Sequence, residues 1–393
     1  MGDWYQCKFL ESAENLKPLV QIRSGRMPSS AIARDIAACL QQGRLFFETA
    51  ETSPLEIRPL QQFYGMVGFA KALTIARRVT ALATLPRSHG IEERSNPGAR
   101  IADLRVAIAP KDRNQRGTFQ EVNDATRALN RFCYYAEGNQ PRCRYVESAA
   151  SENLAGVSMS LKDLLSRVPG IERLFASTFG EPANTAVLTS YQGAPDDCQL
   201  RIDDPELFTD AASAKTIADR WRARFPFLKG WAIDSAERAW GNSIVNFLNV
   251  APPDLEFAPG SVLEVGAALH ANNIRHLAVS RFNYLEQMPP FGGGLSSGGF
   301  PRAVAPFNGA YLSEFSIHYL ALFLLSTLVR YTPQTWMHAI TGSVTTGSPP
   351  DDQPLALIEQ FLDVNWSFIP GFVTTVLNPH NDHTDAGKLP TVS

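Results

Sequence analysis

The sequence has little charge and no long apolar run. Charged residues make up 19% of its 393 positions and the formal net charge is −3, so the chain has no strong overall field to attract a polyanion. Its most apolar stretch, residues 320–329, is much shorter than the roughly 20 residues of a membrane-spanning helix. The first residues lack the basic and apolar segments of a signal peptide. We therefore expect a cytoplasmic protein that does not act on a membrane.

Cysteine is scarce and shows no ligand pattern. Five cysteines, an odd number, occur without a Cys-x-x-Cys pair, which favours reduced thiols over disulfides or zinc ligands. The segment His380–Asp385 near the end has residue types that bind divalent metals. A site needs three oriented ligands, and terminal segments are typically mobile, so we interpret this segment as a polar tail. We expect neither a metal nor another cofactor.

The small net charge hides an asymmetry along the chain. Residues 1–150 contain 21 Lys and Arg against 15 Asp and Glu, or +6, which leaves 15 against 24, or −9, for residues 151–393. The N-terminal region is therefore the candidate for binding nucleic acid or another anionic ligand. Arg77, Arg78 and Arg87 are the candidate ligand-binding residues, because Arg favours bidentate contacts to phosphate and carboxylate. The alternative is a solvated basic surface with no ligand.

The two ends of the chain are predicted to be helical. Apolar residues recur at helical spacing over residues 30–50. A second helix is expected over residues 59–85, where Gly65 and Gly68 allow close approach of a neighbour. A third is expected from Leu312 to Arg330, ended by Pro333, and a fourth over residues 354–364.

The middle of the chain has short β-like runs separated by turn residues. These runs are residues 104–108, 132–135, 186–191, 199–202, 262–265 and 276–282, with helices expected at 160–179 and 212–224. We predict an α+β fold in which N- and C-terminal helical segments form one helical bundle with a mixed α/β middle region inserted. The predicted parts are residues 1–98, 99–287, a Gly/Pro/Ser-rich loop at 288–310, and 311–393.

Three stretches resemble the YaaC-like family of bacterial proteins. They are Gln41–Ala50 (QQGRLFFETA), Pro59–Met66 (PLQQFYGM) with Lys71–Leu73, and Ser316–Tyr319 (SIHY) leading into Ser326–Pro333 (STLVRYTP) with Trp336. Together the three stretches bracket nearly the whole chain, whereas the β-rich middle carries little of the resemblance, and no catalytic residues carry over. The helical ends are also similar to HEPN domains, helical modules that occur in antiviral defence and include ribonucleases. The HEPN signature has four to six residues between Arg and His, whereas seven residues, one of them Pro333, separate Arg330 from His338.

The best catalytic candidates lie on the late helix and in one loop. Glu314 and His318 are one turn apart and can touch, and a carboxylate beside an imidazole can orient it for acid–base chemistry. Arg330 could hold an anion, although sixteen residues at roughly 100° each turn it away from Glu314. His89, before a glycine in a loop, is expected to be exposed and to converge with His318. The alternative is that all four have structural roles.

Other motifs fit their chemistry poorly. Gly294–Gly298 satisfies the hydrolase pattern Gly-x-Ser-x-Gly but has neither the preceding strand nor the following helix. The aromatic residues Trp4, Phe63, Tyr64, Tyr331 and Trp336 are interpreted as core anchors. We therefore expect a binding or regulatory protein, as a component of a bacterial antiviral defence or stress system. The alternative is a metal-independent ribonuclease that uses Arg330 with His318 or His338.

Overall fold

The computed structural model divides the chain into two compact units, which we describe separately. The first contains residues 1–127, 149–183 and 314–379, and the second contains residues 128–148, 184–313 and 380–393. The structure describes residues 4–109, 116–127, 131–135, 141–145, 151–193, 198–203, 214–226, 232–239, 242–248, 291–292, 302–342 and 351–378.

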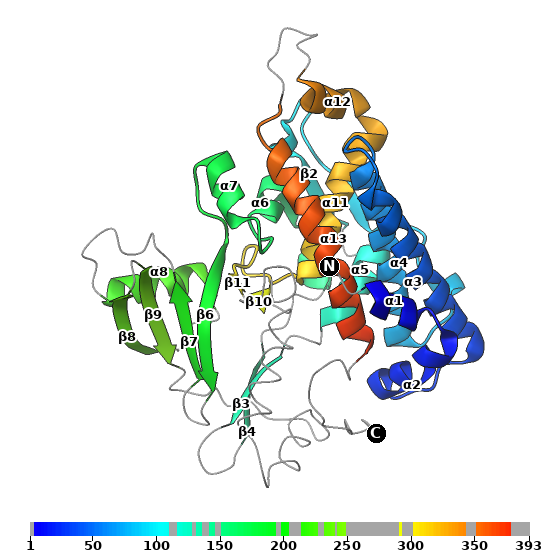
Figure 1. Cartoon of the computed structure of the whole chain (residues 1–393), viewed down its shortest axis with the longest axis horizontal. Helices are drawn as coiled ribbons and strands as arrows, with labels where there is room; N and C mark the ends of the chain where they lie inside the picture. The colour runs from blue at the N-terminus through cyan, green and yellow to red at the C-terminus, as the bar shows by residue number, and fades with distance from the viewer. Residues whose placement is uncertain are drawn as a thin grey trace. The chain divides into compact units, whose positions relative to one another are not determined.

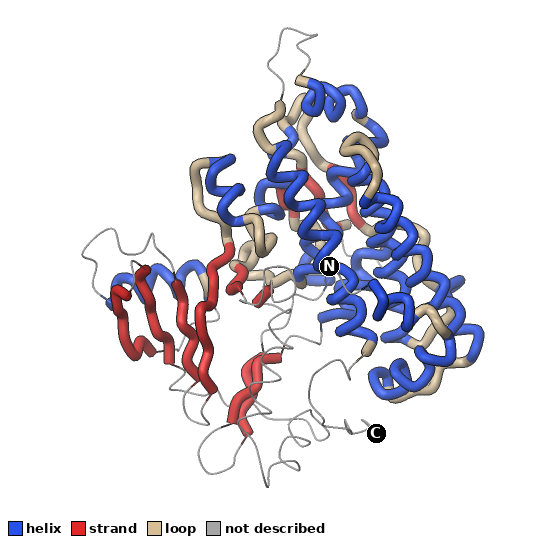
Figure 2. The backbone as a smooth tube through the Cα atoms, viewed as in Figure 1, coloured by secondary structure: helices blue, strands red, loops and turns tan. Residues whose placement is uncertain are grey.

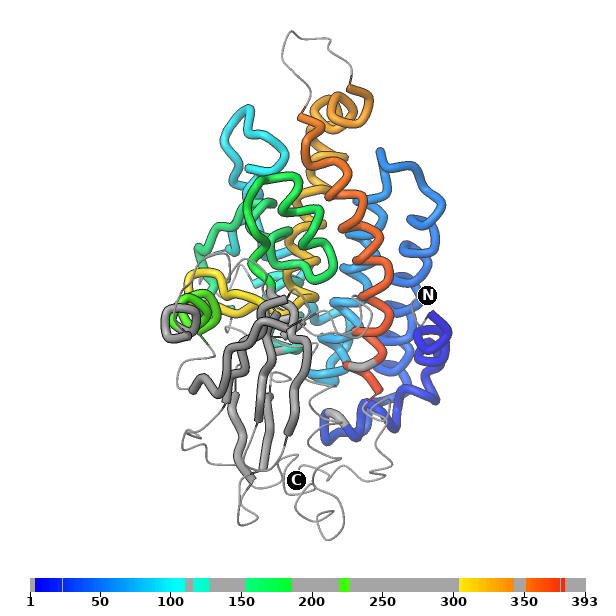
Figure 3. The backbone as a smooth tube through the Cα atoms, turned by 60° about the vertical axis from the view of Figure 1, so that its left-hand side comes forward, coloured from blue at the N-terminus to red at the C-terminus, as the bar shows by residue number. Residues whose placement is uncertain are grey.

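The first unit is a helical bundle built from both ends of the chain (Figure 1). The N-terminal helices are α1 (Trp4–Leu10), α2 (Ala13–Ser24), α3 (Ser30–Glu51) and α4 (Arg58–Arg78), and the C-terminal ones are α11 (Glu314–Tyr331), α12 (Pro333–Thr341) and α13 (Leu355–Leu377). Both α11 and α13 contact α4, and α13 also contacts α1 and α2. Figure 3 shows α13 lying alongside the N-terminal helices from a second direction. The predicted joining of the two ends into one bundle is thus confirmed.

Glycines set the close packing of α3 against α4. A Cβ atom on Gly68 would lie 2.9 Å from the backbone nitrogen of Gly43, so the two backbones nearly touch. A Cβ atom on Gly65 would collide with the Phe47 ring, and one on Gly43 would lie 2.9 Å from the Phe69 ring. The two rings are buried and 5.7 Å apart. The predicted role of Gly65 and Gly68 in allowing close approach is therefore correct.

Two predicted helix ends are wrong. Helix α4 stops at Arg78 rather than near residue 85, because Val79 adopts a left-handed conformation with φ 50° and its N–H bonds to the carbonyl of Ile75. Helix α13 continues to Leu377 through Pro370 instead of ending at residue 364. Burial of an apolar face that includes Phe368 and Phe372 outweighs the hydrogen bond that a proline removes from a helix.

The late apolar helix is an interior helix of the bundle. Nearly all side chains of α11 are buried, which explains why it is apolar on most sides. It ends before Pro333 as predicted, and α12 departs at 99°. No single helix of the described ranges is long and apolar enough to span a membrane, and only this bent pair has the required length and composition when taken together.

Smaller elements complete the first unit. A three-stranded antiparallel sheet has the order β1-β2-β5, formed by β1 (Ile91–Glu93), β2 (Arg105–Ile108) and β5 (Ser158–Ser160). The remaining helices are α5 (Thr118–Arg127), α6 (Leu161–Leu165) and α7 (Glu172–Phe179), and the 3-10 turns are η1 (Leu82–Thr84), η2 (Ile101–Asp103) and η5 (Ser151–Leu154). The single helix predicted over residues 160–179 is two, divided around Pro169 and Gly170.

The second unit is mainly β-sheet (Figure 2). Its antiparallel sheet has the order β10-β11-β6-β7-β9-β8. The strands are β6 (Thr185–Gly193), β7 (Cys198–Asp203), β8 (Ala232–Ala239), β9 (Asn242–Leu248), β10 (Phe291–Gly292) and β11 (Arg302–Val304), beside a β3 (Arg131–Tyr135) and β4 (Pro141–Tyr145) hairpin and helix α8 (Ala214–Arg224). The predicted strands at 262–265 and 276–282, the Gly294–Gly298 motif and the His380–Asp385 segment lie outside the described residues. An α+β fold with helical ends is confirmed.

Candidate functional site

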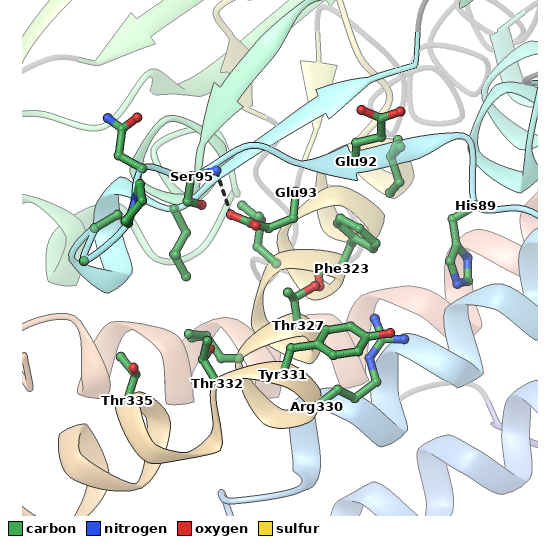
Figure 4. A pocket seen from close by; sticks show the side chains of 18 residues that line it. His89, Glu92, Glu93, Ser95, Phe323, Thr327, Arg330, Tyr331, Thr332 and Thr335 are labelled. Carbon is green, nitrogen blue, oxygen red and sulfur yellow. Dashed lines mark hydrogen bonds between the residues drawn. The ribbon is translucent and has the colours of Figure 1, made fainter.

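The first unit contains a pocket of about 710 Å³ beside α11 (Figure 4). This volume is typical of small-molecule sites. One wall is a face of α11, and the other is the segment of residues 89–99 that includes β1. Its lining residues are His89, Ile91, Glu92, Glu93, Ser95, Asn96, Pro97, Gly98, Ala99, Leu104, Phe323, Leu324, Thr327, Leu328, Arg330, Tyr331, Thr332 and Thr335.

Helical geometry explains how an interior helix supplies one wall. Phe323, Thr327 and Tyr331 recur every four residues and therefore share one face of α11. Their exposure rises toward the end of the helix, because Phe323 is buried, Thr327 is half-buried and Tyr331 is 70% exposed. Pro333 then ends α11 and turns the chain into α12, so that Thr335 closes this end of the pocket. Tyr331 is thus not the core anchor that the sequence predicted.

The positive group of this wall is Arg330. Its Nε donates to the carbonyl oxygen of Ser326 at 3.3 Å and an Nη donates to the Ser326 hydroxyl at 3.4 Å. The guanidinium carbon lies 4.9 Å from the ring centroid of Tyr331 and 5.9 Å from that of Phe63. Among the described residues these contacts include no carboxylate. A half-buried, permanently charged guanidinium without a carboxylate favours an anionic ligand.

The histidine of the opposite wall sits on a rigid loop. The backbone N–H of Phe119, in the first turn of α5, donates to the carbonyl of His89 at 3.0 Å. Gly90 has φ 74°, and a Cβ atom on either Gly90 or Gly117 would collide with the backbone of the other. The Gln120 side chain also donates to the Gly90 carbonyl. These contacts fix the backbone on both sides of the His89 side chain.

The environment of His89 keeps its imidazole neutral. Burial lowers its pKa below the usual value, and the nearby charges of Arg330 and Lys71 lower it further. Its Nδ1 lies 3.4 Å from the hydroxyl oxygen of Tyr319, and its ring centroid is 5.2 Å from that of Phe63. His89 is half-buried rather than exposed as predicted.

Two carboxylates line the β1 side of the pocket. Glu92 forms an ion pair with Arg94. A carboxylate oxygen of Glu93 accepts from the backbone N–H of Ser95 at 2.7 Å, and in Figure 4 this carboxylate is turned toward Ser95. The pocket therefore has a cationic group, Arg330, near the neutral imidazole of His89, and an acceptor-rich region at β1.

The other two predicted catalytic residues belong to the interior of the bundle. His318 is fully buried and Glu314 nearly so, and neither lines the pocket. Nδ1 of His318 lies 2.8 Å from the side-chain oxygen of Asn365, whose amide nitrogen donates to the oxygen of Gln62 at 2.9 Å. The Gln62 amide donates in turn to the carbonyl of Leu362 at 3.0 Å. We call His318, Asn365 and Gln62 the interior polar chain.

The order of donors in this chain fixes the state of its histidine. Because both amide nitrogens donate along the chain, the Asn365 oxygen must accept from a protonated Nδ1 of His318. Nε2 is then the unprotonated nitrogen, 3.9 Å from a carboxylate oxygen of Glu314. Burial lowers the pKa of His318 to about 4, and the bond to Asn365 opposes this only in part. His318 is therefore neutral at physiological pH and tied to α13.

The predicted catalytic residues thus separate into two places. His89 and Arg330 share the pocket, whereas Glu314 and His318 contact each other in the interior. The convergence of His89 with His318 is wrong; the neighbour that reaches His89 is Tyr319.

The three predicted ligand-binding arginines lie elsewhere in the first unit. Arg77 and Arg78 are exposed in the last turn of α4, and Arg87 is exposed in the loop that follows η1. Arg78 forms an ion pair with Glu121 on α5. None of the three lines the pocket.

Several residues of both regions could not be predicted from the sequence. Asn365, Glu93 and Thr327 belong to no motif, and no local pattern marks them. One available signal was the polar stretch that follows the basic end of α4, with its His89–Gly90 and Pro97–Gly98 pairs. Such turn residues allow a loop to fold back on a helix and form a pocket wall.

The arrangement suits binding and proton exchange. The pocket can hold a small anion at Arg330, accept hydrogen bonds at Glu93, and offer an imidazole that gains or loses a proton. Within the described ranges, no group of three or more His, Cys, Asp or Glu could hold a metal ion.

A family model described as YaaC-like Protein matches residues 11–376, from α2 to the end of α13. Neither the curated proteins nor the solved structures contain a match to this chain.

Proposed function

The chain belongs to the YaaC-like protein family, and from this premise we propose that it is a binding or regulatory protein whose ligand is a small anion held at Arg330. One observation carries the proposal. Arg330 is half-buried at the wall of a pocket of about 710 Å³, and its contacts among the described residues leave its charge without a carboxylate partner. Since an unpaired charge costs free energy when it is withdrawn from water, a bound anion stabilises it.

The proposal predicts that small anions stabilise the folded protein through Arg330. A ligand at a hundred times its Kd adds about 2.7 kcal/mol to the free energy of unfolding. We expect at least one member of a panel of phosphate, pyrophosphate, citrate and acetate to raise the Tm of the wild type, measured by calorimetry at constant ionic strength. Arg330→Gln should lose this response.

Arg34→Gln is the matched control, because Arg34 lies on α3 and its Nε also donates to the carbonyl four residues earlier, that of Ser30. It removes the same charge from an exposed position outside the pocket, so its response to the anions should equal that of the wild type. An Arg330→Gln protein that still responds like the wild type would place the anion elsewhere and contradict the proposal.

The alternative function is cleavage of RNA. His89 and Arg330, which flank one pocket, are better placed for it than the buried His318. Purified protein incubated with labelled single-stranded RNA and tRNA would test both functions, beside Arg330→Ala, His89→Ala and His318→Ala. Cleavage that both pocket variants lose would favour the ribonuclease, and binding without cleavage would favour the regulatory role.

We propose a cytoplasmic setting and a role in bacterial antiviral defence or stress, in line with the likeness of the helical ends to HEPN domains. The exposed Arg77, Arg78 and Arg87 are the proposed contact surface for nucleic acid or a protein partner in that role. Replacing all three by Glu should abolish binding of an anionic macromolecule, and unchanged affinity would remove this surface from the proposal.

A further inference from the structure

Two side chains that can carry a positive charge, Arg330 and His89, line the same pocket. Figure 4 shows the guanidinium of Arg330 between the ring of Tyr331 and the side chain of His89. The charge of Arg330 is close enough to His89 to oppose its protonation. An anion bound beside both groups would remove this opposition, because an opposite charge within about 4–6 Å favours the charged form of a titratable group.

The partner of His89 accommodates either protonation state. Burial raises the pKa of the Tyr319 hydroxyl, which therefore stays neutral. Toward a neutral imidazole this hydroxyl donates to Nδ1, and toward an imidazolium its oxygen accepts from the Nδ1–H, across the same separation of 3.4 Å. His89 can thus change charge without losing its buried contact.

Resting on the proposed function, we infer that Arg330 and His89 together form a subsite for a dianionic phosphate monoester, and that His89 takes up one proton from solvent when this group binds. The step forms one N–H bond, at the Nδ1 of His89, and breaks one O–H bond of a solvent hydronium ion; nothing is oxidised or reduced. Two positive groups match two negative charges, whereas a phosphodiester of RNA carries only one charge per phosphate.

The other charged groups around His89 do not cancel this match. Lys71 on α4 adds positive charge. On β1, Glu92 is paired with Arg94, and Glu93 is turned toward Ser95 and away from His89 in Figure 4. On α5, Glu121 is engaged by Arg78 and Arg116.

NMR titration of the His89 imidazole tests the inference directly. The full-length protein would be titrated from low to neutral pH alone, with methyl phosphate, and with dimethyl phosphate, at matched ionic strength set with sodium chloride. His89→Gln identifies the resonance. Sulfate is a second dianion that does not itself titrate in this range.

Methyl phosphate and sulfate are expected to raise the pKa of His89 by about one unit or more, and dimethyl phosphate should leave it unchanged. Arg330→Gln should abolish the shift, and Arg34→Gln should retain it. Equal shifts with the monoester and the diester would overturn the assignment to a dianion.

Other outcomes separate this inference from the proposed function. Stabilisation by methyl phosphate that depends on Arg330 but leaves the pKa of His89 unchanged would overturn proton uptake and leave the binding function standing. The absence of any Arg330-dependent response to the whole anion panel would overturn both.

Discussion

The interior polar chain and the pocket place two histidines in opposite circumstances within one unit. His318 is fully buried and donates to Asn365, whereas His89 is half-buried and lines the pocket that also contains the guanidinium of Arg330. Both are held neutral, chiefly by burial. The difference lies in what can reach them. We propose that an anion enters the pocket and changes the charge of His89, whereas His318 is fully buried and does not line the pocket.

The largest effect on stability is expected from breaking the interior polar chain. Asn365→Ala leaves the Nδ1–H of His318 and the side-chain oxygen of Gln62 without partners in the core, and each buried unsatisfied group costs about 1–3 kcal/mol. We expect urea unfolding to give a loss of roughly 4 kcal/mol. The anion response at Arg330 should persist in the folded variant. A loss below the cost of one such group would show that the interior polar chain does not stabilise the bundle.

The second test concerns pH. The pKa of His318 is about 4 in the folded protein and about 6.5 in the unfolded chain, so the unfolded state binds the proton more readily. Stability is retained above pH 6.5 and falls as pH decreases toward 4, by roughly 3 kcal/mol. His318→Gln should lack this part of the pH dependence when unfolding is measured by urea at several pH values. Identical slopes in the two proteins would contradict the neutral state of His318.

The smallest effect is expected at Tyr319, where adjacent residues of α11 belong to the pocket and to the interior polar chain. Tyr319 lies next to His318 in sequence, but its hydroxyl contacts His89. Tyr319→Phe should cost about 1 kcal/mol, since it removes one buried hydrogen bond, and should shift the NMR titration of His89. The part of the pH dependence that belongs to His318 should remain. If the variant changed that part as well, the two histidines would be coupled and the contrast between them would be lost.

Sequence patterns predicted the elements that depend on local order. The apolar run before Pro333 predicted α11. Gly65 and Gly68, in an apolar segment, predicted the close contact of α4 with α3. The helical ends were expected to meet, and they do. The patterns failed at Pro370, where packing overrides a local helix breaker, and at Val79, where a β-branched residue adopts a conformation that is rare for its type.

The site was harder to predict because its parts are far apart in the chain. His318 and Glu314 look like a catalytic pair by their spacing, and only the position of α13 shows that Asn365 engages the imidazole. His89 and Arg330 are 241 residues apart in numbering (330 − 89), and no periodicity relates them. Burial decides between a reactive and a structural histidine, and burial is a property of the assembled bundle.

The bond between Gln62 and Asn365 joins positions 303 residues apart, which has a consequence for synthesis on the ribosome. Helices α3 and α4 can pair as soon as both have emerged, since their contact is local. The slot for α13, with the polar end of Gln62 at its floor, stays empty until Leu355–Leu377 have been made. The nascent protein therefore carries an open apolar groove from the synthesis of α4 until that of α13, a state in which chaperones bind and aggregation begins.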